Sequence, residues 1–462
     1  MVVSTVFLFT SCLKDDETTT TYPSDAAITG FTLGNLKRYT TTTSSTGTTS
    51  TTTTTVAGST YKFYIDQVNK LIYNPDSLPY GVDAKHVVCT ITSKNSGVIT
   101  IKSMVSDTLR YYNTEDSIDF SVPRIVQVNS LDGKSRARYT VQVNVHKEKA
   151  DTFLWSNMVT MRPFAEAHNM KAVSLGDKVY VFVSDGSICH VYSSPDGDDK
   201  EWMLENLDRP LPASAWKNVV TMGKYMYAYA DGRIMRSTNG HDWTAGASAS
   251  ISQLVAAGSR TLYAYGLDGS LLASDDEGAI WLPEKIDDET ELLPTNELSY
   301  SMVPSSVNED VETVTIIGNR SVSEYDTEKT AQVWSKVEDP LDDKHEDSWM
   351  YITDRDMPTW GLPRLASLTV ISYDKGLLAT GGEGLGGCTA KPFQHFYYSN
   401  NGGIYWVESN VYKIPQGLDS NDVFTMAADS SNRLWLICGG TGEVWRGRMS
   451  GAKNEVQTSY TH

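Results

Sequence analysis

The sequence predicts an all-β protein in which an N-terminal β-sandwich domain is followed by a β-propeller. Three observations predict this fold class. A short phrase that ends in Trp recurs along the second half of the chain, and repeats indicate an array of similar structural units. Runs of apolar, β-branched and aromatic residues precede the copies, as in strands that are buried on both faces. The 462 residues also suit two domains, of about 120 and about 300 residues.

The chain is expected to divide into four segments. Residues 1–25 form a lipoprotein signal and tether, residues 26–148 the β-sandwich domain, residues 151–450 the propeller and residues 451–462 a tail. The propeller segment is long for one domain, but propellers are built from repeated modules and reach this size.

The N-terminal segment contains a short apolar run that ends at Ser11 and Cys12. The run is too short to span a bilayer and lacks a preceding basic region, so we expect the true start upstream. It resembles a bacterial lipobox, which implies lipidation of Cys12 and makes outer-membrane lipid a partner. The stretch at 14–17, Lys-Asp-Asp-Glu, resembles the export signal of Bacteroidetes surface lipoproteins. That resemblance implies an outer-membrane, lipid-anchored protein that faces the cell exterior.

The N-terminal domain alternates apolar and polar residues over 87–91 and 98–101, which predicts strands. The Thr-rich tract at 40–55 has high β propensity and contains a Ser-Thr-Gly turn. With the flanking strands 31–33 and 61–65 we therefore expect one long hairpin with a polar tip and not a disordered stalk. The domain resembles an immunoglobulin-like module that is common in Bacteroidetes lipoproteins.

Three phrases in this domain resemble the Asp-Ser/Thr-apolar O-glycosylation signal of the same phylum. The implied acceptors are Ser77, Thr108 and Ser117. Phrases of three residues also arise by chance, so chance occurrence is an equal alternative at each site.

The recurring phrase has a physical logic. Its Asp or Asn accepts hydrogen bonds from nearby backbone N–H groups and its Gly supplies a positive φ, so a tight turn carries the Trp to a buried position. The phrase resembles the Asp-box of sialidase-type (BNR-repeat) propellers, Ser-x-Asp-x-Gly-x-x-Trp. We expect a structural role for the residues of the four copies, which are Ser194, Asp196, Trp202, Ser237, Asn239, Trp243, Ser274, Asp276, Gly278, Trp281, Ser399, Asn401, Gly403 and Trp406.

Each phrase closes a unit of strand, strand, Asp-Gly turn, strand and Trp strand, which is one four-stranded blade. We count six blades, with seven as the alternative. The last blade lacks a terminal Trp strand, and residues 153–155 before the first blade can supply it, which leaves no free sheet edge. Together the two domains resemble a family of Bacteroidetes surface lipoproteins, with an immunoglobulin-like domain and an Asp-box propeller, to which no function is assigned.

Composition limits the partners. The net charge of −18 disfavours nucleic acid and anionic membrane surfaces. The four Cys other than Cys12 and the His residues show no ligand spacing, so we expect no metal and no cofactor. Cys189 and Cys438 fall in the first and last blades, which are neighbours in a closed ring, and their pairing is left open.

The candidate binding site is expected on the face opposite the recurring turns. Residues 336–365 form a long predicted connection between blades, and long loops in compact domains are usually functional or disordered. Exposed aromatic rings beside carboxylates suit a sugar, because the rings stack and the carboxylates accept from hydroxyls. Alternatively, Trp349 and Trp360 cap the propeller core. The candidate ligand-binding residues are Trp349, Tyr351, Trp360, Asp354, Asp356 and, near the first blade, Arg162.

We therefore expect a surface-anchored lipoprotein whose propeller binds a glycan or protein ligand without catalysis, in polysaccharide capture. One alternative is a sialidase-like glycoside hydrolase, which needs three Arg for the substrate carboxylate, a Tyr nucleophile with a Glu, and an Asp. The propeller Arg residues are scattered, so no catalytic residue is assigned. A second alternative is a structural subunit of an outer-membrane complex.

Overall fold

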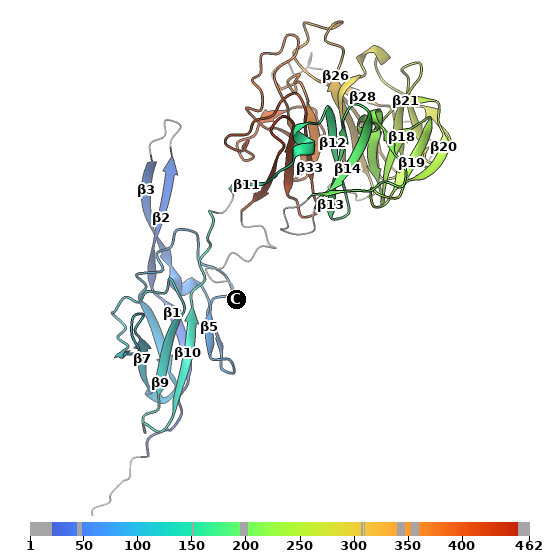
Figure 1. The fold of residues 1–462 in the computed structure, drawn as a ribbon. Helices are drawn as coiled ribbons and strands as arrows, with labels where there is room; N and C mark the ends of the chain where they lie inside the picture. Colours follow the sequence, from blue (N-terminus) through green and yellow to red (C-terminus); the bar gives the residue numbers. More distant parts are fainter. Residues whose placement is uncertain are drawn as a thin grey trace, which may run out of the picture. The chain divides into compact units, whose positions relative to one another are not determined.

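The computed structural model describes residues 21–43, 49–149, 152–194, 202–305, 308, 310–339, 347–352 and 360–450. The chain forms two compact units (Figure 1): Met1–Ala150 together with Ser450–His462, and Asp151–Met449. Each unit is described by itself. In the described residues almost all regular structure is β-strand, which confirms the predicted all-β class. No helix among them has both the length and the hydropathy needed to cross a membrane.

The N-terminal unit contains ten strands in its described part. They are β1 (Ile28–Leu33), β2 (Asn35–Thr43), β3 (Thr49–Ala57), β4 (Tyr64–Asp66), β5 (Leu71–Tyr73), β6 (Cys89–Ser93), β7 (Val98–Lys102), β8 (Leu109–Tyr111), β9 (Arg124–Asn129) and β10 (Arg136–Gln142). The main sheet has the order β4-β5-β10-β9-β7-β8, and β1-β6 and β2-β3 form two further pairs. The β5–β10 pair is parallel and the other pairs are antiparallel.

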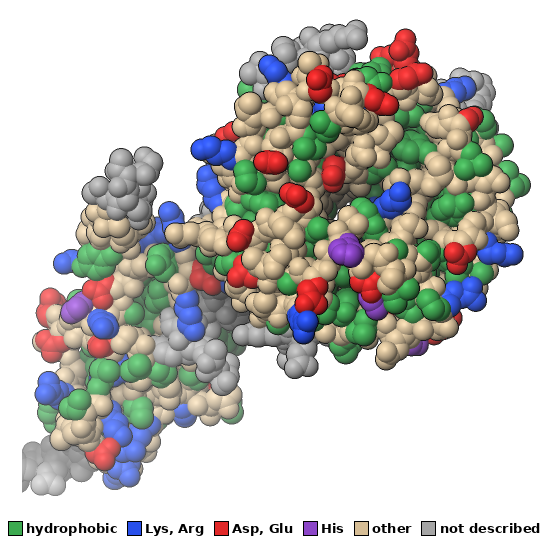
Figure 2. Space-filling model, turned by 45° about the horizontal axis from the view of Figure 1, so that its top comes forward, with side chains coloured by type: hydrophobic (Ala, Val, Ile, Leu, Met, Phe, Trp, Pro, Cys, Tyr) green, Lys and Arg blue, Asp and Glu red, His purple; other side chains and the backbone are tan. Residues whose placement is uncertain are grey.

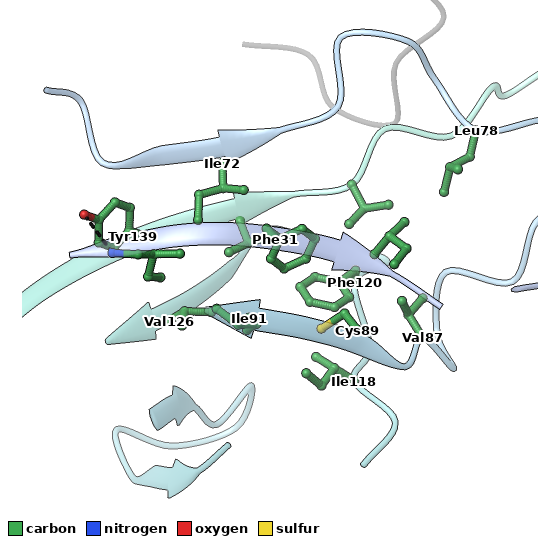
Figure 3. Packing of buried hydrophobic residues seen from close by; sticks show 14 of the residues in the cluster. Phe31, Ile72, Leu78, Val87, Cys89, Ile91, Ile118, Phe120, Val126 and Tyr139 are labelled. Atoms are coloured by element: carbon green, nitrogen blue, oxygen red, sulfur yellow. Dashed lines mark hydrogen bonds between the residues drawn. The ribbon is translucent and has the colours of Figure 1, made fainter. Parts of the chain in front are cut away.

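Strand β6 shows how alternation along a strand builds the core of this unit. In β6 the side chains of Cys89 and Ile91 are buried, whereas the Thr residues between and after them are exposed. Figure 3 shows Phe31 and Phe120 pointing toward one another in the core, with ring centroids 5.9 Å apart. Tyr139 is fully buried, and its hydroxyl donates to Gln67 Oε1 at 2.6 Å. A buried tyrosine needs such a partner because an unpaired hydroxyl in the core is costly.

The Thr-rich tract forms a hairpin as predicted, but its expected flanking strands are not part of it, because β1 pairs with β6 and β4 pairs with β5. β2 and β3 pair in continuous register from Asn35 opposite Ala57 to Thr43 opposite Thr49. The predicted turn itself, at 45–47, lies outside the described residues. Of the three implied O-glycosylation acceptors, Thr108 and Ser117 are exposed and Ser77 is half-buried. Cys12 lies outside the described residues.

The second unit is built from antiparallel sheets. Its strands are β11 (Phe153–Thr160), β12 (Asn169–Leu175), β13 (Lys178–Ser184), β14 (Ile188–Ser193), β15 (Met203–Leu204), β16 (Leu211–Pro212), β17 (Val219–Met222), β18 (Tyr225–Ala230), β19 (Arg233–Ser237), β20 (Thr244–Ser248), β21 (Ile251–Ala257), β22 (Leu262–Gly266), β23 (Leu271–Ser274), β24 (Leu282–Pro283), β25 (Asn296–Pro304), β26 (Glu312–Asn319), β27 (Gln332–Glu338), β28 (Met350–Ile352), β29 (Thr369–Tyr373), β30 (Gly376–Thr380), β31 (Tyr397–Ser399), β32 (Val407–Glu408), β33 (Phe424–Ala428), β34 (Leu434–Cys438) and β35 (Glu443–Met449). Short helices α1 (Arg162–Ala165), η3 (Ala213–Asn218) and η4 (Thr290–Leu292) lie in the connections.

The described strands form six sheets whose innermost strands make a closed ring. Each of β12, β17, β21, β25 and β29 contacts the innermost strand of the next sheet, and β33 contacts β12. This cyclic arrangement is that of a β-propeller. Small hydroxyl side chains bridge the splayed inner strands. The hydroxyls of Ser301 and Ser372 lie 2.6 Å apart, and Thr425 Oγ1 accepts the N–H of Ala172 at 2.8 Å.

The ring closes as predicted. β11, which contains Phe153 and Trp155, pairs antiparallel with β35, so the first strand of the unit completes the last sheet. The Nε1–H of Trp155 donates to the backbone oxygen of Lys413 at 2.6 Å. This pairing joins the two ends of the unit, with β11 as the outermost strand of the last sheet.

The recurring turns show the predicted hydrogen bonds. Ser274 Oγ donates to Asp276 Oδ1 at 2.8 Å, and the N–H of Ile280 donates to the same carboxylate oxygen at 2.9 Å. The Nε1–H of Trp281 donates to the oxygen of Gly278 at 3.0 Å. Equivalent Trp-to-Gly bonds join Trp243 to Gly240 and Trp406 to Gly403. In the first copy Ser194 and Trp202 are buried, and Asp196 lies outside the described residues.

The structure corrects the expectation for residues 336–365 and answers the open question of Cys189 and Cys438. The prediction of one connection over 336–365 is wrong, because β27 runs on to Glu338 and β28 (Met350–Ile352) pairs with it. β28 is therefore the outermost strand of the sheet β25-β26-β27-β28, and the stretch is not one connection between blades. The three-residue β28 was too short to be predicted. Cys189 and Cys438 are free, buried thiols, and burial raises the pKa of each to about 12.

Candidate functional site

The innermost strands of the propeller unit enclose a cavity of about 530 Å³. Its lining comes from the innermost strands and from the segments that precede them, including Trp216 and Lys217 in η3. We call the end of the unit at which these strands begin the connection face, marked by Asn169, Asn296 and Thr369. The opposite end, which carries the recurring turns, is the turn face. The volume lies within the range of about 300–1,000 Å³ that is typical of small-molecule sites.

Two side chains reach across the cavity from opposite sides of the ring. β12 and β25 lie three positions apart in the ring of innermost strands, so Lys171 of β12 and Tyr300 of β25 face each other. The Lys171 ammonium lies 5.6 Å from the centroid of the Tyr300 ring, a cation–π contact. The Tyr300 hydroxyl accepts the N–H of Thr221 in β17 at 2.7 Å, which fixes the ring. Burial lowers the pKa of Lys171 to about 8.

The connection-face end of the cavity carries two acids. Glu297, the second residue of β25, has a φ of 51°, a left-handed conformation that is rare outside glycine. Desolvation and the nearby Asp422 raise the pKa of the Glu297 carboxyl, whereas the N–H of Ser367 opposes the rise. Among the described residues no ion pair within 4.0 Å involves Glu297, Asp422, Lys171 or Lys217. Within the part of the chain that the structure describes, four charged residues that line the cavity therefore lack a counter-ion within 4.0 Å.

An aromatic side chain borders the same end. Trp216 lines the cavity and is half-buried on η3, the segment that leads into β17. The helix is held by Asn218, which donates to the Ser214 oxygen at 3.1 Å and accepts the N–H of Leu254 at 3.1 Å. The Trp216 side chain itself packs against the hydrophobic cluster that contains Ala215 and Val219, which holds the indole at the rim. Figure 2 shows a face of this unit on which acidic, basic and hydrophobic side chains are interspersed.

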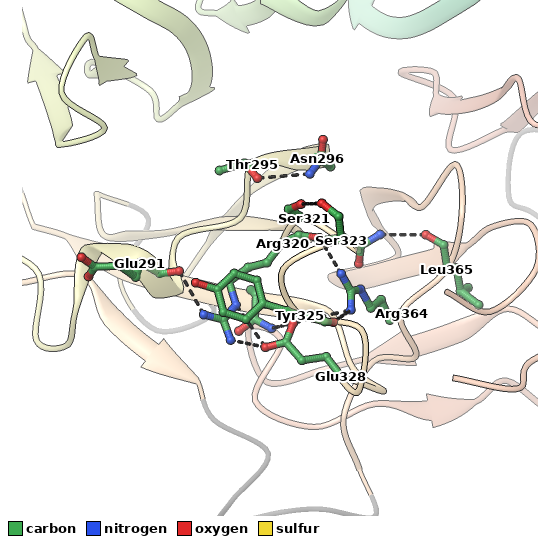
Figure 4. Close-up of polar contacts among 12 residues, drawn as sticks. Glu291, Thr295, Asn296, Arg320, Ser321, Ser323, Tyr325, Glu328, Arg364 and Leu365 are labelled. Atoms are coloured by element: carbon green, nitrogen blue, oxygen red, sulfur yellow. Dashed lines mark hydrogen bonds and ion pairs between the residues drawn. The ribbon is translucent and has the colours of Figure 1, made fainter. Parts of the chain in front are cut away.

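A buried arginine stiffens the connection face (Figure 4). Arg364, fully buried, donates to the backbone oxygens of Tyr325 and Arg320, the latter at 2.6 Å. Asn319 Nδ2 donates to the Leu365 oxygen at 2.9 Å. Arg320 lies over the Tyr325 ring at 3.5 Å and pairs with Glu328. These contacts lock the segment between β26 and β27 to the segment that precedes β29, so the rim beside Asn296 is rigid.

The sequence-predicted ligand residues do not converge. Trp349 is fully buried, donates to the Glu284 carboxylate at 3.0 Å and packs edge-on against Tyr263, so it is not available to a ligand. The Tyr351 hydroxyl donates to Gln332, and its ring lies against Trp334.

The remaining predicted ligand residues are scattered. Trp360 is 45% exposed but packs on Tyr405, and Arg162 pairs with Glu166 at 2.8 Å on the helix α1. Asp354 and Asp356 lie outside the described residues. None of the described candidates lines the cavity.

Sequence reasoning missed Lys171 and Tyr300. The available signal was a lysine inside the apolar run of β12, at a position that turns toward the ring centre. The sialidase-like alternative required three Arg at this cavity, and the described lining contains no Arg. Arg320 and Arg364 are instead bound to protein carboxylate and carbonyl groups.

Residues 149–455 match the family model described as the DUF6242 beta propeller domain, and residues 31–143 match the model of the DUF6242 N-terminal domain, a domain of unknown function. No curated protein matches the chain.

Similar solved structures are distant. They include a carbohydrate-active enzyme of family AA12 from Trichoderma reesei (9% identity, 66% of this chain and 97% of that chain, TM-score 0.37). The Pan2 WD40 domain of Neurospora crassa is similar at 12% identity, over 66% of this chain and 97% of that chain, with a TM-score of 0.36. A gluconolactonase of Xanthomonas campestris is similar at 11% identity, over 66% and 99%, with a TM-score of 0.34. At these TM-scores the likenesses carry no further argument.

Proposed function

Since the chain belongs to the DUF6242 family and carries that family's β-propeller domain, we propose that the propeller is a non-catalytic glycan-binding module. The binding site is the central cavity, entered from the connection face. The observation that carries the proposal is the combination of Trp216, Glu297 and Asp422 at one end of a cavity of about 530 Å³.

This combination matches the two surfaces of a sugar. A pyranose ring has an apolar face, which packs on a fixed indole such as that of Trp216, and hydroxyl groups around its edge. Carboxylates without protein counter-ions, here Glu297 and Asp422, accept hydrogen bonds from those hydroxyls, and bonds to a charged acceptor are stronger than neutral ones. A few polar groups that converge on a largely preformed pocket are typical of ligand sites.

The proposal includes the setting of the protein. We propose a Bacteroidetes surface lipoprotein, anchored in the outer membrane through acylated Cys12, that captures polysaccharide at the cell exterior. The N-terminal unit serves as an immunoglobulin-like spacer, and the six sheets of the second unit are six blades whose turns are Asp-boxes. The sequence features at 12–17 and the hydrogen bonds of the recurring turns support these assignments.

A glycan array followed by calorimetry with the strongest-binding glycan tests the function. Replacing Trp216 by Ala is expected to weaken binding about tenfold or more, as for other central aromatic contacts. Glu297→Gln keeps the side-chain size and removes the charged acceptor, so it is expected to weaken binding without a packing defect. Trp360→Ala removes an exposed Trp that does not line the cavity and is the matched control.

Two results would overturn the proposal. One is the failure of every glycan to bind the folded chain. The other is a loss of binding in Trp360→Ala with none in Trp216→Ala, because the site would then lie outside the cavity. Capture of a protein and of no glycan would favour a protein ligand instead.

A further inference from the structure

Resting on the proposed function, we infer that the ligand is an acidic saccharide, and that Lys171 binds the anionic group of the sugar unit that enters the cavity. The inference names a substrate class for the proposed site. It rests on the position of Lys171, on the fixed ring of Tyr300 and on the acids at the connection-face end.

The Lys171 ammonium is desolvated beside an aromatic ring. Lys171 lies in the ring of innermost strands, and its ammonium lies 5.6 Å from the centroid of the Tyr300 ring. Transferring an ammonium group out of water is costly unless an anion compensates it. The depressed pKa of Lys171, about 8, is the sign of that uncompensated desolvation. A ligand anion beside Lys171 supplies the compensation that the described protein does not.

The Tyr300 ring beside Lys171 is held in place by hydrogen bonds. Tyr300 is held by the N–H of Thr221 at 2.7 Å, and Thr221 Oγ1 lies 3.2 Å from the same hydroxyl. The ring beside the ammonium is therefore fixed by β17, which lies two positions from β25 in the ring of innermost strands. A cation held in place loses little conformational entropy on binding, so it discriminates between charged and neutral ligands.

The cavity is lined by two acids as well as by two lysines. Glu297 and Asp422 belong to the segments at the start of β25 and before β33, whereas Lys171 and Lys217 come from β12 and the segment before β17. The acids disfavour a ligand that is anionic throughout, because like charges repel. They favour hydroxyl donors. An acidic sugar has both parts, hydroxyls for the acids and one anionic group for Lys171.

Calorimetry on the full chain tests the inference with three probes. A disaccharide of glucuronic acid and galactose carries one carboxylate beside a neutral sugar, its methyl ester is the same saccharide without that charge, and a galactose 6-sulfate disaccharide carries sulfate instead. We expect the acid to bind at least about tenfold more tightly than the ester. Binding of the sulfated probe in place of the acid would identify sulfate as the anion, and the inference would stand.

A lysine substitution locates the effect. Lys171→Met keeps the length of the side chain and removes its charge, and it is expected to reduce the preference for the acid over the ester to about twofold or less. Lys224→Met removes an equal charge from an exposed residue between β17 and β18, on the turn face, and is expected to change nothing. Thermal unfolding of both variants checks that they fold.

The outcomes separate this inference from the proposed function. Equal affinity for acid and ester, or a preference that survives Lys171→Met, overturns the inference and leaves glycan binding intact. Absence of binding by all glycans, acidic and neutral, overturns the proposed function itself.

Discussion

A buried pair of carboxyl groups predicts how the stability of the propeller depends on pH. Glu338 of β27 lies directly opposite Glu312 of β26, and both side chains are buried. Desolvation, together with Glu312, raises the pKa of Glu338 to about 7 from 4.5, while the Tyr263 hydroxyl and Lys336 oppose the rise. The folded state therefore holds a proton that the unfolded chain releases at lower pH.

Proton linkage gives the direction and the size of the change in unfolding free energy with pH. Because the folded pKa is the higher one, Glu338 costs no stability below pH 4.5, and the cost grows from there until the pH passes about 7. A rise in pKa of this size corresponds to about 3 kcal/mol of unfolding free energy lost over that interval. Glu338→Gln imitates the protonated form, since an amide donates to Glu312 and accepts from Tyr263. The variant is expected to be more stable than the unsubstituted protein at pH 8, by up to about 3 kcal/mol, and no more stable at pH 4.5.

Urea unfolding followed by Trp fluorescence measures this change. All 11 Trp residues lie between Trp155 and Trp445, so the fluorescence reports the propeller unit alone. Glu289→Gln, at an exposed position, is the control and is expected to leave the pH profile unchanged. Equal pH profiles for Glu338→Gln and the unsubstituted protein would refute the reasoning, as would a variant that is less stable at pH 8.

Two further predictions concern the two units. Gly278 has a φ of 88° and an added Cβ would lie 2.7 Å from Ile234, whereas Gly232, with a φ of 75°, has nothing within 4 Å. Gly278→Ala is therefore expected to lower the free energy of unfolding in urea by at least about 1 kcal/mol more than Gly232→Ala does. Equal losses would contradict the packing argument. Tyr139→Phe removes the hydroxyl that donates a hydrogen bond to Gln67 and is expected to destabilise the N-terminal unit by about 1–3 kcal/mol. Unfolding monitored by circular dichroism measures this loss. An unchanged transition would show that this buried bond contributes nothing.

Local chemistry made much of the fold predictable. The Asp or Asn at 239, 276 and 401 has an intrinsic preference for bonding nearby N–H groups, and the structure has those bonds. The Thr-rich hairpin followed from β propensity, and the pairing of Phe153 with the last sheet followed from the missing strand of the final repeat. Each of these rests on a pattern that is readable within a short window.

The site was not predictable in this way. Lys171 and Tyr300 belong to strands on opposite sides of the ring, and only ring closure brings them together. Trp349 looked exposed because it stands among acidic residues, but its N–H reaches Glu284 and the indole is buried. The pattern of polar and apolar residues around a short strand does not show which of its side chains are buried in the core.

Hydrogen exchange with and without the strongest-binding glycan of the array tests the central claim most directly. Binding in the cavity predicts slower exchange in Ala213–Asn218 and at the start of Asn296–Pro304, the segments that carry Trp216 and Glu297. Unchanged exchange in both segments, with protection confined to the turn face or to the N-terminal unit, would contradict the account.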